Sequence, residues 1–200
     1  MTAIEPAAVD AAWVSVDAPL TVSQLAEFCR DLERLYRINP YLEFRHWRKA
    51  GEGRYAAAWR NGSNARDFAF ELAVERNSDC DFTVRYDRGI KRATRFRIEP
   101  SPAGSRLIVT DDYSGAATPD ALDAGEIDRS LHGWGMALHQ YLQREARWSR
   151  YAAWRWYMRR VWLPMKPAAR RITFMLLIIT AAEIAVIALV MAVYWAEQVR

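Results

Sequence analysis

The stretch AWVSVDAPLTVSQLAEFCRDLERLYRINPYLEF, residues 12–44, decides the fold of this chain. Its first residues alternate between apolar and polar side chains, and this pattern predicts a β-strand. Thr21 followed by Gln24 is a capping-box signature, and apolar residues then recur at helical spacing as far as Tyr36. Pro40 limits the helix because the residue before a proline is disfavoured in helical conformation. The chain therefore begins with a strand followed by one helix.

From Tyr41 to Tyr113 the apolar residues follow a period of two, which is typical of strands with one buried face. Turns that contain glycine or proline divide this region, and Asn61-Gly62 is a strong hairpin signal. The six candidate strands are Tyr41–Lys49, Arg54–Arg60, Asp67–Glu75, Asp81–Arg88, Arg92–Glu99 and Arg106–Tyr113. With the first strand they predict an antiparallel sheet of about six to seven strands, apolar on one face and polar on the other.

The apolar face of such a sheet needs a cover, and the segment after the last strand provides one. Its apolar residues are spaced by three or four positions: Ile127, Leu131, Trp134, Leu138 and Leu142. This spacing predicts a long helix that lies across the sheet. No proline occurs between Glu126 and Leu163, so we expect the helix to continue beyond the sheet as a stalk. The predicted fold class is α+β.

Residues 172–196, ITFMLLIITAAEIAVIALVMAVYWA, contain one ionisable side chain, Glu183, and neither glycine nor proline. A helix of these 25 residues is about 37 Å long, and the hydrocarbon core of a bilayer is about 30 Å thick. We therefore expect one transmembrane helix, followed by a short tail at 197–200 in a tail-anchored arrangement.

The charges on either side of this span predict its orientation. Residues 144–171 hold nine basic side chains and one acidic side chain, whereas residues 1–143 hold 18 basic and 21 acidic ones. Basic residues next to a transmembrane helix favour the cytoplasmic side. The amino terminus lacks the basic and apolar regions of a secretory signal, and the two cysteines, Cys29 and Cys80, fit a reducing compartment. The sequence thus predicts a single-pass protein of a bacterial inner membrane, with its amino-terminal domain in the cytoplasm.

Four regions follow from these patterns: a soluble domain at 1–145, a basic aromatic juxtamembrane stalk at 146–171, the transmembrane helix at 172–196 and the tail. Tryptophan and arginine side chains interleave in the stalk, and together they favour lipid headgroups. The residues predicted to contact the membrane interface are Trp154, Trp156, Arg159, Arg160, Trp162, Arg170 and Arg171. Aromatic rings and cations can also bind nucleic acid, but the adjacent span favours membrane lipids, and no nucleic-acid partner is expected.

Residues 12–44 and the closing segment Glu126–Leu142 resemble the helix-grip fold of the START and Bet v 1-like superfamily, which includes polyketide cyclase-like proteins. The resemblance covers roughly residues 9–145 and contains no diagnostic catalytic motif. It implies a long helix over an antiparallel sheet. It also implies either a hydrophobic ligand held between the sheet and that helix, or cyclisation chemistry in the same cavity.

Most side chains that face the predicted interior are aromatic. The candidates for lining a ligand pocket are Tyr55, Trp59, Phe68, Phe70, Phe82, Tyr86, Phe96, Trp134, Leu138 and His139. A packed hydrophobic core explains the same residues without a ligand. Gly133 and Gly135 also have two interpretations, since they permit either close packing of the helix on the sheet or free space beneath it.

Metal and acid-base chemistry find little support in the sequence. His132 and His139 are seven positions apart, about 10 Å along a helix, which is too far for one metal ion. Asp111 and Asp112 end the last strand, and we interpret them and the acidic residues that follow as favourable charges before a helix amino terminus. No metal and no cofactor is predicted.

Three functions remain open. The first is a membrane-anchored cytoplasmic module that binds a hydrophobic ligand or lipid at the membrane surface. The second is a non-catalytic accessory subunit of a membrane complex, docked through Glu183 to other transmembrane helices, because a carboxylate in mid-span is costly without a partner. The third is a cyclase-like enzyme that uses scattered groups such as His139 and Tyr86. It ranks last because the apolar face offers few polar residues.

Overall fold

The computed structural model describes residues 11–89, 91–114 and 124–198. The chain divides into two compact units, one ending at Pro164 and the other beginning at Met165. The first unit holds a sheet and its covering helices, and the second is a single long helix.

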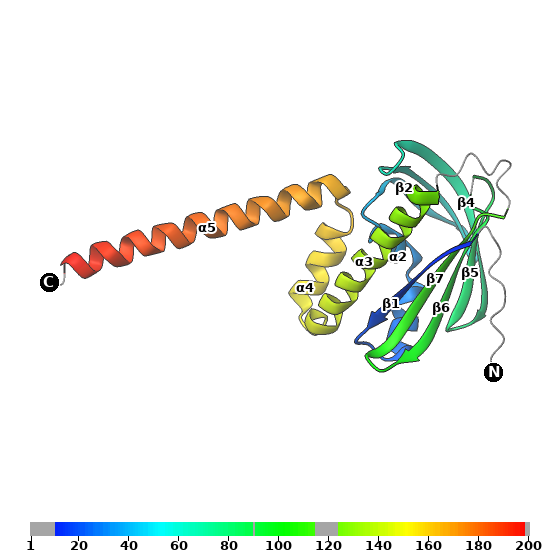
Figure 1. Ribbon diagram of the computed structural model, residues 1–200, viewed down its shortest axis with the longest axis horizontal. Coiled ribbons are helices and arrows are strands. Elements are labelled where there is room, and N and C mark those ends of the chain that lie inside the picture. The colour runs from blue at the N-terminus through cyan, green and yellow to red at the C-terminus, as the bar shows by residue number, and fades with distance from the viewer. Residues whose placement is uncertain (1–10, 90, 115–123, 199–200) are drawn as a thin grey trace. The chain divides into compact units, whose positions relative to one another are not determined.

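Seven antiparallel strands among the described residues form one sheet in the order β1-β7-β6-β5-β4-β3-β2 (Figure 1). Their bounds are β1 Ala11–Ala18, β2 Leu42–Gly51, β3 Arg54–Asn61, β4 Arg66–Ser78, β5 Asp81–Tyr86, β6 Ala93–Ser101 and β7 Gly104–Asp112. Strands β2 to β6 each pair with the next strand in the chain, and β1 pairs with β7 so that Trp13 lies opposite Thr110. The predicted antiparallel sheet of six to seven strands is confirmed.

The segment after β1 begins with the predicted capping box. The Thr21 hydroxyl accepts a hydrogen bond from the Gln24 amide at 3.2 Å, and the Gln24 side-chain oxygen accepts one from the Thr21 amide at 3.0 Å. Both bonds satisfy amides that lack partners at a helix start. Helix α1 (Val22–Arg30) follows.

Helix α1 ends earlier than the sequence predicts, and a second helix, α2 (Leu32–Arg37), follows it directly. Asp31 separates the two helices, because its carboxylate accepts a hydrogen bond from the Arg34 amide at 3.1 Å and so caps α2. Short polar side chains compete with the helix backbone in this way. The prediction of one continuous helix as far as Tyr36 is therefore wrong.

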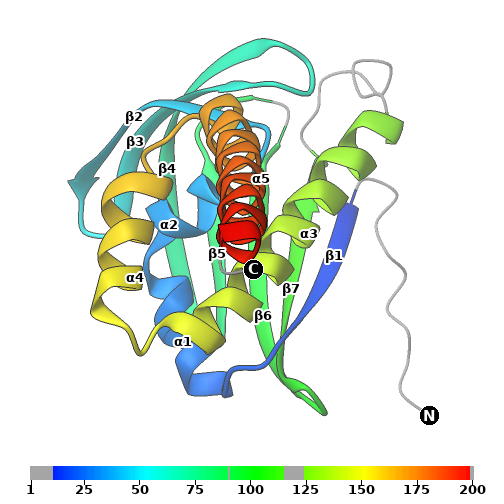
Figure 2. The same ribbon diagram turned by 90° about the vertical axis from the view of Figure 1, so that its left-hand side faces the viewer.

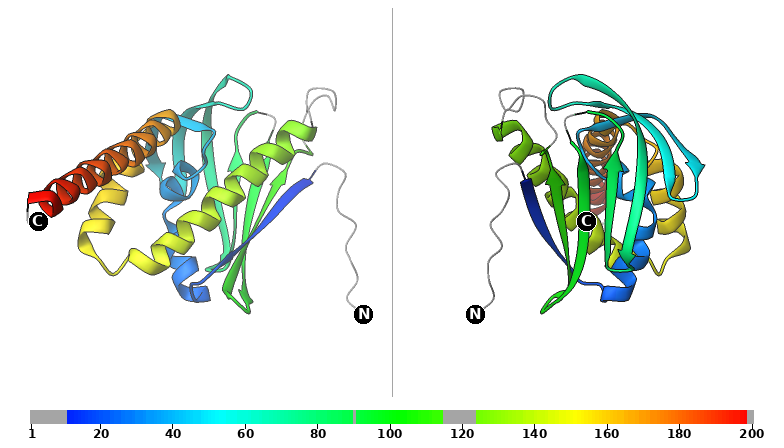
Figure 3. Two further views of the ribbon diagram at one scale, coloured as in Figure 1. Left: turned by 60° about the vertical axis from the view of Figure 1, so that its left-hand side comes forward. Right: turned by 90° about the vertical axis from the view of Figure 1, so that its right-hand side faces the viewer.

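Helix α3 (Ala124–Trp148) covers the sheet and packs mainly along β1 (Figure 3). The predicted inward residues that the structure describes are at most 4% exposed: Leu131, Trp134, Leu138 and Leu142. The side chain of Ile127 lies outside the described residues. Residues spaced by three and four share one side of a helix, and the predicted α+β architecture with a long covering helix is confirmed.

The two faces of the sheet differ as predicted. On the polar face, which none of the described helices covers, cross-strand ion pairs such as Arg95 with Asp81 and Arg85 with Glu75 lie between neighbouring strands, each at 2.7 Å. Helices α1, α2 and α3 lie over the other face (Figure 3), and apolar side chains fill the core between them and the sheet. This division follows from the strand geometry, because successive side chains point to opposite faces.

The prediction of an unbroken helix as far as Leu163 is wrong, because α3 ends at Trp148. A short helix, α4 (Ala152–Tyr157), and a π-helical segment, η2 (Met158–Trp162), follow in a new direction (Figure 2). Met158 and Leu163 are 3% and 6% exposed and belong to the core of the first unit. Burial of these apolar side chains favours folding of the segment onto the domain over an extended stalk.

Arg155 stabilises the turn between α3 and α4. Its guanidinium donates to the carbonyl of Ser149 at 2.7 Å and to the carbonyl of Arg150 at 3.2 Å. Carbonyls at the carboxy terminus of a helix have no partner within the helix, and a cation there is favourable. One side chain thus caps α3 and holds the change of direction.

The second unit is helix α5 (Pro167–Gln198). Its part Pro167–Ala196 is long and apolar enough to cross a membrane, by length and composition, and the most apolar window is not buried in the structure. The helix begins at a proline, which suits the first helical position because its missing amide needs no partner there. Helix α5 therefore starts before residue 172, where the predicted transmembrane region begins. The bounds of the membrane-spanning region itself, 172–196, stay a prediction.

Gly133 and Gly135 let α3 approach its neighbours closely. A Cβ atom on Gly133 would lie 2.5 Å from Cε2 of Tyr41, and one on Gly135 would lie 2.6 Å from Cγ2 of Val14. Both distances are far shorter than a normal contact between carbon atoms. Of the two interpretations of these glycines, close packing is the one that the structure shows.

Gly135→Ala is expected to lower the free energy of unfolding by about 1 kcal/mol. Alanine raises helix propensity by about 1 kcal/mol, but overpacking costs about 1–3 kcal/mol, and the β-branched Val14 has little freedom to rotate away. Urea unfolding of the full chain in detergent, followed by near-ultraviolet circular dichroism, measures the change. Met136→Ala, at an exposed neighbouring position, is the control. A Gly135→Ala variant as stable as the native chain would contradict this account.

Candidate functional site

Tyr36, on α2, occupies the centre of the space between the sheet and the helices. It is 2% exposed, and its ring centroid lies 5.3 Å from that of Trp134, 5.9 Å from that of Trp59 and 6.2 Å from that of Phe96. These rings come from α3, β3 and β6, so Tyr36 joins the helices to the sheet. Protein side chains thus fill the middle of the interior.

Aromatic residues at one end of the sheet are only partly buried. They are Phe44, Trp47, Tyr55, Phe68, Phe70 and Tyr86, on strands β2 to β5, and we call them the open aromatic surface. Ring contacts connect them: Phe70 lies 5.5 Å from Phe68 and 5.4 Å from Tyr86. Apolar rings that stay partly exposed beside a core are suited to contact a hydrophobic molecule.

The structure brings most of the predicted pocket residues into one cluster. Five are buried in the core: Trp59, Phe82, Phe96, Trp134 and Leu138. Four belong to the open aromatic surface: Tyr55, Phe68, Phe70 and Tyr86. His139 differs from them, because its Nδ1 lies 2.9 Å from the Asp17 carbonyl of β1. Contact of these residues with a ligand stays a prediction.

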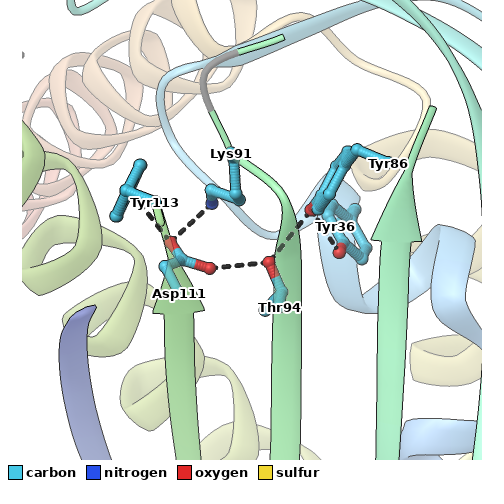
Figure 4. Close-up of polar contacts among 6 residues, drawn as sticks. All are labelled: Tyr36, Tyr86, Lys91, Thr94, Asp111 and Tyr113. Carbon is cyan, nitrogen blue, oxygen red and sulfur yellow. Dashed lines mark hydrogen bonds and ion pairs between the residues drawn. The ribbon is translucent and has the colours of Figure 1, made fainter. Parts of the chain in front are cut away.

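A chain of hydrogen bonds leads from Tyr36 across the sheet to the end of β7 (Figure 4). The hydroxyls of Tyr36 and Tyr86 lie 2.7 Å apart, and the Tyr86 hydroxyl lies 3.0 Å from Oγ1 of Thr94. Thr94 then donates to Oδ1 of Asp111 at 2.6 Å. We call these residues the polar chain.

A lysine and a tyrosine complete the polar chain at Asp111 (Figure 4). Nζ of Lys91 donates to Oδ2 of Asp111 at 2.5 Å, and the hydroxyl of Tyr113 donates to the same oxygen at 3.3 Å. The side chain of Asp111 is 3% exposed and that of Lys91 is 27% exposed. The buried Asp111 carboxylate therefore accepts hydrogen bonds from three described side chains, one of which, Lys91, carries the opposite charge.

The carboxylate of Asp111 sets the direction of the hydroxyl protons in the chain. An ionised carboxylate only accepts hydrogen bonds, so Thr94 gives its proton to Asp111 and accepts from Tyr86. Tyr86 in turn accepts from Tyr36. Because these hydroxyl protons point toward Asp111, the oxygens of Tyr36 and Tyr86 have lone pairs but no free proton.

Burial changes the proton affinity of these groups. Burial raises the pKa of Tyr36, Tyr86 and Tyr113 above the ordinary tyrosine value. Burial lowers the pKa of Lys91, but the Asp111 carboxylate and the nearby tyrosines raise it more, so the pKa lies above its ordinary value. The tyrosines therefore stay neutral and the lysine stays charged to higher pH than in the unfolded chain.

Stability is expected to fall steeply above about pH 10, the ordinary pKa of lysine and tyrosine. Each group with a raised pKa contributes to the free energy of unfolding, and this contribution is fully present below that pH. It is lost as the pH rises through the folded-state pKa, by up to about 1.4 kcal/mol per pH unit for each group. Tyr113→Phe removes one such group and makes the decline shallower. Urea unfolding between about pH 9 and about pH 12 measures the slope. Tyr151→Phe, outside the polar chain, is the control, and an equal slope in both variants would contradict the assignment.

Sequence reasoning missed most of the polar chain. Thr94 lies two residues before Phe96 on β6, and Asp111 lies two residues after Val109 on β7, so both are in phase with the buried residues of their strands. The interpretation of Asp111 as a charge before a helix is wrong, since its side chain is buried against Thr94 and Lys91. The sequence does contain a sign of the polar chain, because Thr94 and Asp111 are polar residues at strand positions whose neighbours in phase are buried.

Arg34, on α2, forms a second buried polar group. Its Nε donates to the Tyr141 hydroxyl at 3.1 Å, its Nη2 lies 2.7 Å from Glu145, and its guanidinium lies 4.7 Å from the centre of the Phe28 ring. A pocket of about 530 Å³ adjoins it, lined by Leu20, Gln24, Glu27, Phe28, Arg30, Asp31, Arg34, Glu145, Ser149 and Arg159. Acidic and basic side chains balance in this lining, so the pocket does not favour an ion of one sign.

The structure separates the predicted membrane-interface residues. Trp154 and Trp162 are partly buried and pack on the core, and the Trp154 indole nitrogen is buried without a hydrogen-bond partner among the described residues. Three others are exposed on the first unit: Trp156, Arg159 and Arg160. Arg170 and Arg171 belong to α5. Contact of these residues with a membrane stays a prediction.

Solved structures share this architecture. The protein TTHA0849 from Thermus thermophilus is 14% identical, and the alignment covers 66% of this chain and 95% of that one with a TM-score of 0.52. A START superfamily protein from Mycobacterium smegmatis is 16% identical, with 66% and 94% covered and a TM-score of 0.50. This chain has the helix-grip fold of the START superfamily. No sequence family and no curated protein matches it.

The helix-grip sheet places the aromatic and polar parts of the site side by side. Phe70, Tyr86, Thr94 and Asp111 come from four adjacent strands, and Thr94 lies directly opposite Asp111 in the pairing of β6 with β7. Within the described residues, no three His, Cys, Asp or Glu side chains gather as metal ligands. The arrangement is suited to noncovalent contact with a molecule that is largely apolar and carries one polar group.

Proposed function

We propose that this chain is a membrane-anchored helix-grip module that binds a hydrophobic molecule or lipid with a hydroxyl group. The open aromatic surface is the observation that carries the proposal. Its residues are partly exposed, whereas Tyr36, Trp59, Phe96 and Trp134 are buried. A ligand on this surface covers apolar area that otherwise contacts water, and burial of each 100 Å² of such area contributes about 2.5 kcal/mol before the costs of binding.

Tyr86 supports the choice of a hydroxyl-bearing ligand. Its ring lies 5.4 Å from that of Phe70, and its hydroxyl belongs to the polar chain. That hydroxyl gives its proton to Thr94 and accepts from Tyr36, which leaves one lone pair. A hydroxyl or an N–H group of a ligand can satisfy this lone pair, whereas a ligand carbonyl or ether meets no free proton on the Tyr86 hydroxyl.

Titration calorimetry with two probes of similar shape tests this function. The full chain in nanodiscs is titrated with 2-naphthol, a donor, and with 2-methoxynaphthalene, an acceptor, with empty nanodiscs as the baseline. We expect 2-naphthol to bind at least about tenfold more tightly, as one hydrogen bond allows. Phe70→Leu should weaken the binding of both probes. Trp13→Ala, at a position 66% exposed on β1, should weaken the binding of neither. Absent binding, or equal effects of the two variants, would overturn the proposal.

The proposed anchor is α5. Its part Pro167–Ala196 has the length and composition of a span, and the net charge of residues 144–171 favours a cytoplasmic first unit. We expect the chain to stay with membranes during alkaline carbonate extraction, and the first unit to be cleaved by protease only from the cytoplasmic side. Extraction by carbonate would contradict the anchor, and cleavage from the other side would contradict the orientation.

A second candidate function is that of an accessory subunit. Glu183 lies in the middle of α5, with an exposed side chain. A carboxyl group at this depth in a bilayer is costly unless it is protonated or paired, so a helix of another subunit is the proposed partner. Purification in mild detergent should return one defined partner with the native chain and with Val190→Ala, but not with Glu183→Ala. A protein that purifies alone in all three cases argues against a subunit role.

A further inference from the structure

Many arginines of the first unit are paired with acidic residues, but those near the end of α3 are not. Nine of them lie within 4 Å of a carboxylate: Arg30, Arg34, Arg37, Arg45, Arg85, Arg88, Arg95, Arg97 and Arg106. Of the arginines that form no ion pair with any described residue, six are grouped around the turn between α3 and α4: Arg144, Arg147, Arg150, Arg155, Arg159 and Arg160. The one acidic residue in this segment, Glu145, is engaged by Arg34. The positive charge of residues 144–160 is therefore not neutralised within the domain.

Exposed aromatic residues accompany these arginines. Trp148, Tyr151 and Trp156 are 40%, 44% and 63% exposed. The guanidinium of Arg147 lies 5.2 Å from the Trp148 ring, and that of Arg150 lies 4.7 Å from the Tyr151 ring. We call residues 144–160 the α3–α4 corner. Its combination of unpaired cations with half-exposed rings is typical of surfaces at the membrane–water interface.

The covalent chain limits the distance between this corner and the proposed anchor. Four residues, 163–166, connect η2 to α5. Even a fully extended chain of this length reaches only about 18 Å. If α5 crosses a bilayer, the end of η2 is therefore confined to the headgroup region or the water directly beside it.

We propose that the α3–α4 corner docks the domain on the surface of a bilayer that contains anionic phospholipids. The inference rests on anchoring by α5 and adds a defined face of contact. The unpaired arginines bind lipid phosphates, and Trp148, Tyr151 and Trp156 enter the interfacial layer. Trp154 and Trp162 pack on the core and take no part. The interface residues predicted from the sequence include those two tryptophans, whereas Trp148 and Tyr151 lie in the predicted stalk but are not among them.

A polarity-sensitive label on the full chain tests the docking. Acrylodan is attached at Trp156→Cys or, as the matched control, at Trp13→Cys, in a Cys80→Ser background in which Cys29 is buried. In nanodiscs with phosphatidylglycerol, we expect blue-shifted emission at residue 156 relative to pure phosphatidylcholine, and no difference at residue 13. Salt at about 0.5 M should reverse the shift, because it screens charges beyond about 4–5 Å. Equal emission in the two lipids at residue 156 would overturn the proposal.

Charge variants test whether the emission shift depends on the arginines of the α3–α4 corner or on the overall charge of the domain. Arg147→Gln, Arg150→Gln and Arg160→Gln together should abolish the shift, as expected for about a hundredfold weaker attraction. Three exposed arginines of the sheet provide the control triple variant: Arg48→Gln, Arg54→Gln and Arg60→Gln. The control variant should keep the shift. Equal loss in both triple variants would contradict a specific docking face.

Two further measurements distinguish the possible failures. Carbonate extraction of each variant reports on α5 alone, so a chain that resists extraction but shows no lipid-dependent shift disproves the docking and leaves the anchor intact. A chain that carbonate removes disproves the anchor and with it the docking. Duplex DNA added to phosphatidylcholine nanodiscs should not shift the label, and a shift at micromolar DNA would assign the corner to nucleic acid instead.

Discussion

Tyr36→Ala is expected to lower the free energy of unfolding by about 3–5 kcal/mol, because loss of a buried aromatic ring removes its contacts and leaves a cavity. Tyr36 is 2% exposed. The rings that contact it belong to Trp47, Trp59, Phe96 and Trp134. They are held on three strands and on α3, so the surroundings cannot easily close the space. Urea unfolding of the full chain in detergent, followed by near-ultraviolet circular dichroism, measures the loss.

Tyr36→Phe is the matched control for this ring. Phenylalanine keeps the ring but removes the proton that Tyr36 gives to the Tyr86 hydroxyl at 2.7 Å. The expected loss is about 1 kcal/mol, the usual net value of one hydrogen bond. If Tyr36→Phe costs as much as Tyr36→Ala, the polar chain and not the packing of the ring stabilises the interior.

Lys91→Met is expected to lower the free energy of unfolding by about 3–5 kcal/mol, because it leaves a buried carboxylate without its opposite charge. The side chain of Asp111 is 3% exposed, and after the change the donors left to it among the described residues are the hydroxyls of Thr94 and Tyr113. Lys49→Met, at an exposed position on β2, is the control and should change stability by less than about 0.5 kcal/mol. The same unfolding experiment measures both.

The double variant Lys91→Met/Asp111→Leu tests whether the two charges act as a pair. Replacing both partners of a buried ion pair by apolar residues is often close to neutral, whereas removing one partner is not. We therefore expect the double variant to be more stable than Lys91→Met alone. Losses that simply add in the double variant would show that Lys91 and Asp111 contribute independently.

The sheet and its cover could be predicted from short-range patterns. Phe96 and Ile98 alternate with arginines on β6, and both are at most 5% exposed. Leu138 and Leu142 follow the helical spacing and are fully buried. The backbone imposes these periods, so the face of each residue follows from its neighbours in the sequence.

The polar chain could not be predicted in the same way. Thr94 and Asp111 each look like an isolated polar residue at the edge of an apolar strand. Only the pairing of β6 with β7 places them opposite each other, and only the path of the chain before β6 brings Lys91 to the same carboxylate. A buried charged pair also conflicts with the apolar pattern of the strands, so that pattern gives no sign of it.

The break at the end of α3 shows how a tertiary contact overrides a local pattern. Nothing between Glu126 and Leu163 forbids a helix, and the residues at the turn are ordinary helix formers or neutral. The chain bends because Met158 and Leu163 gain burial on the domain and because Arg155 caps the end of α3. That bend also decides which aromatic residues of the α3–α4 corner are exposed.

The sequence by itself determined the antiparallel sheet, the inward stripe of α3 and one apolar helix long enough to cross a membrane. These features depend on residues a few positions apart, which the backbone geometry relates directly. The tertiary structure decided the central place of Tyr36, the polar chain and the unpaired arginines of the α3–α4 corner. Tyr36 and Tyr86 are 50 positions apart, and Arg34 and Tyr141 are 107 apart. Contacts over such separations are set by the packing of whole elements, because no local preference of the chain relates the two residues.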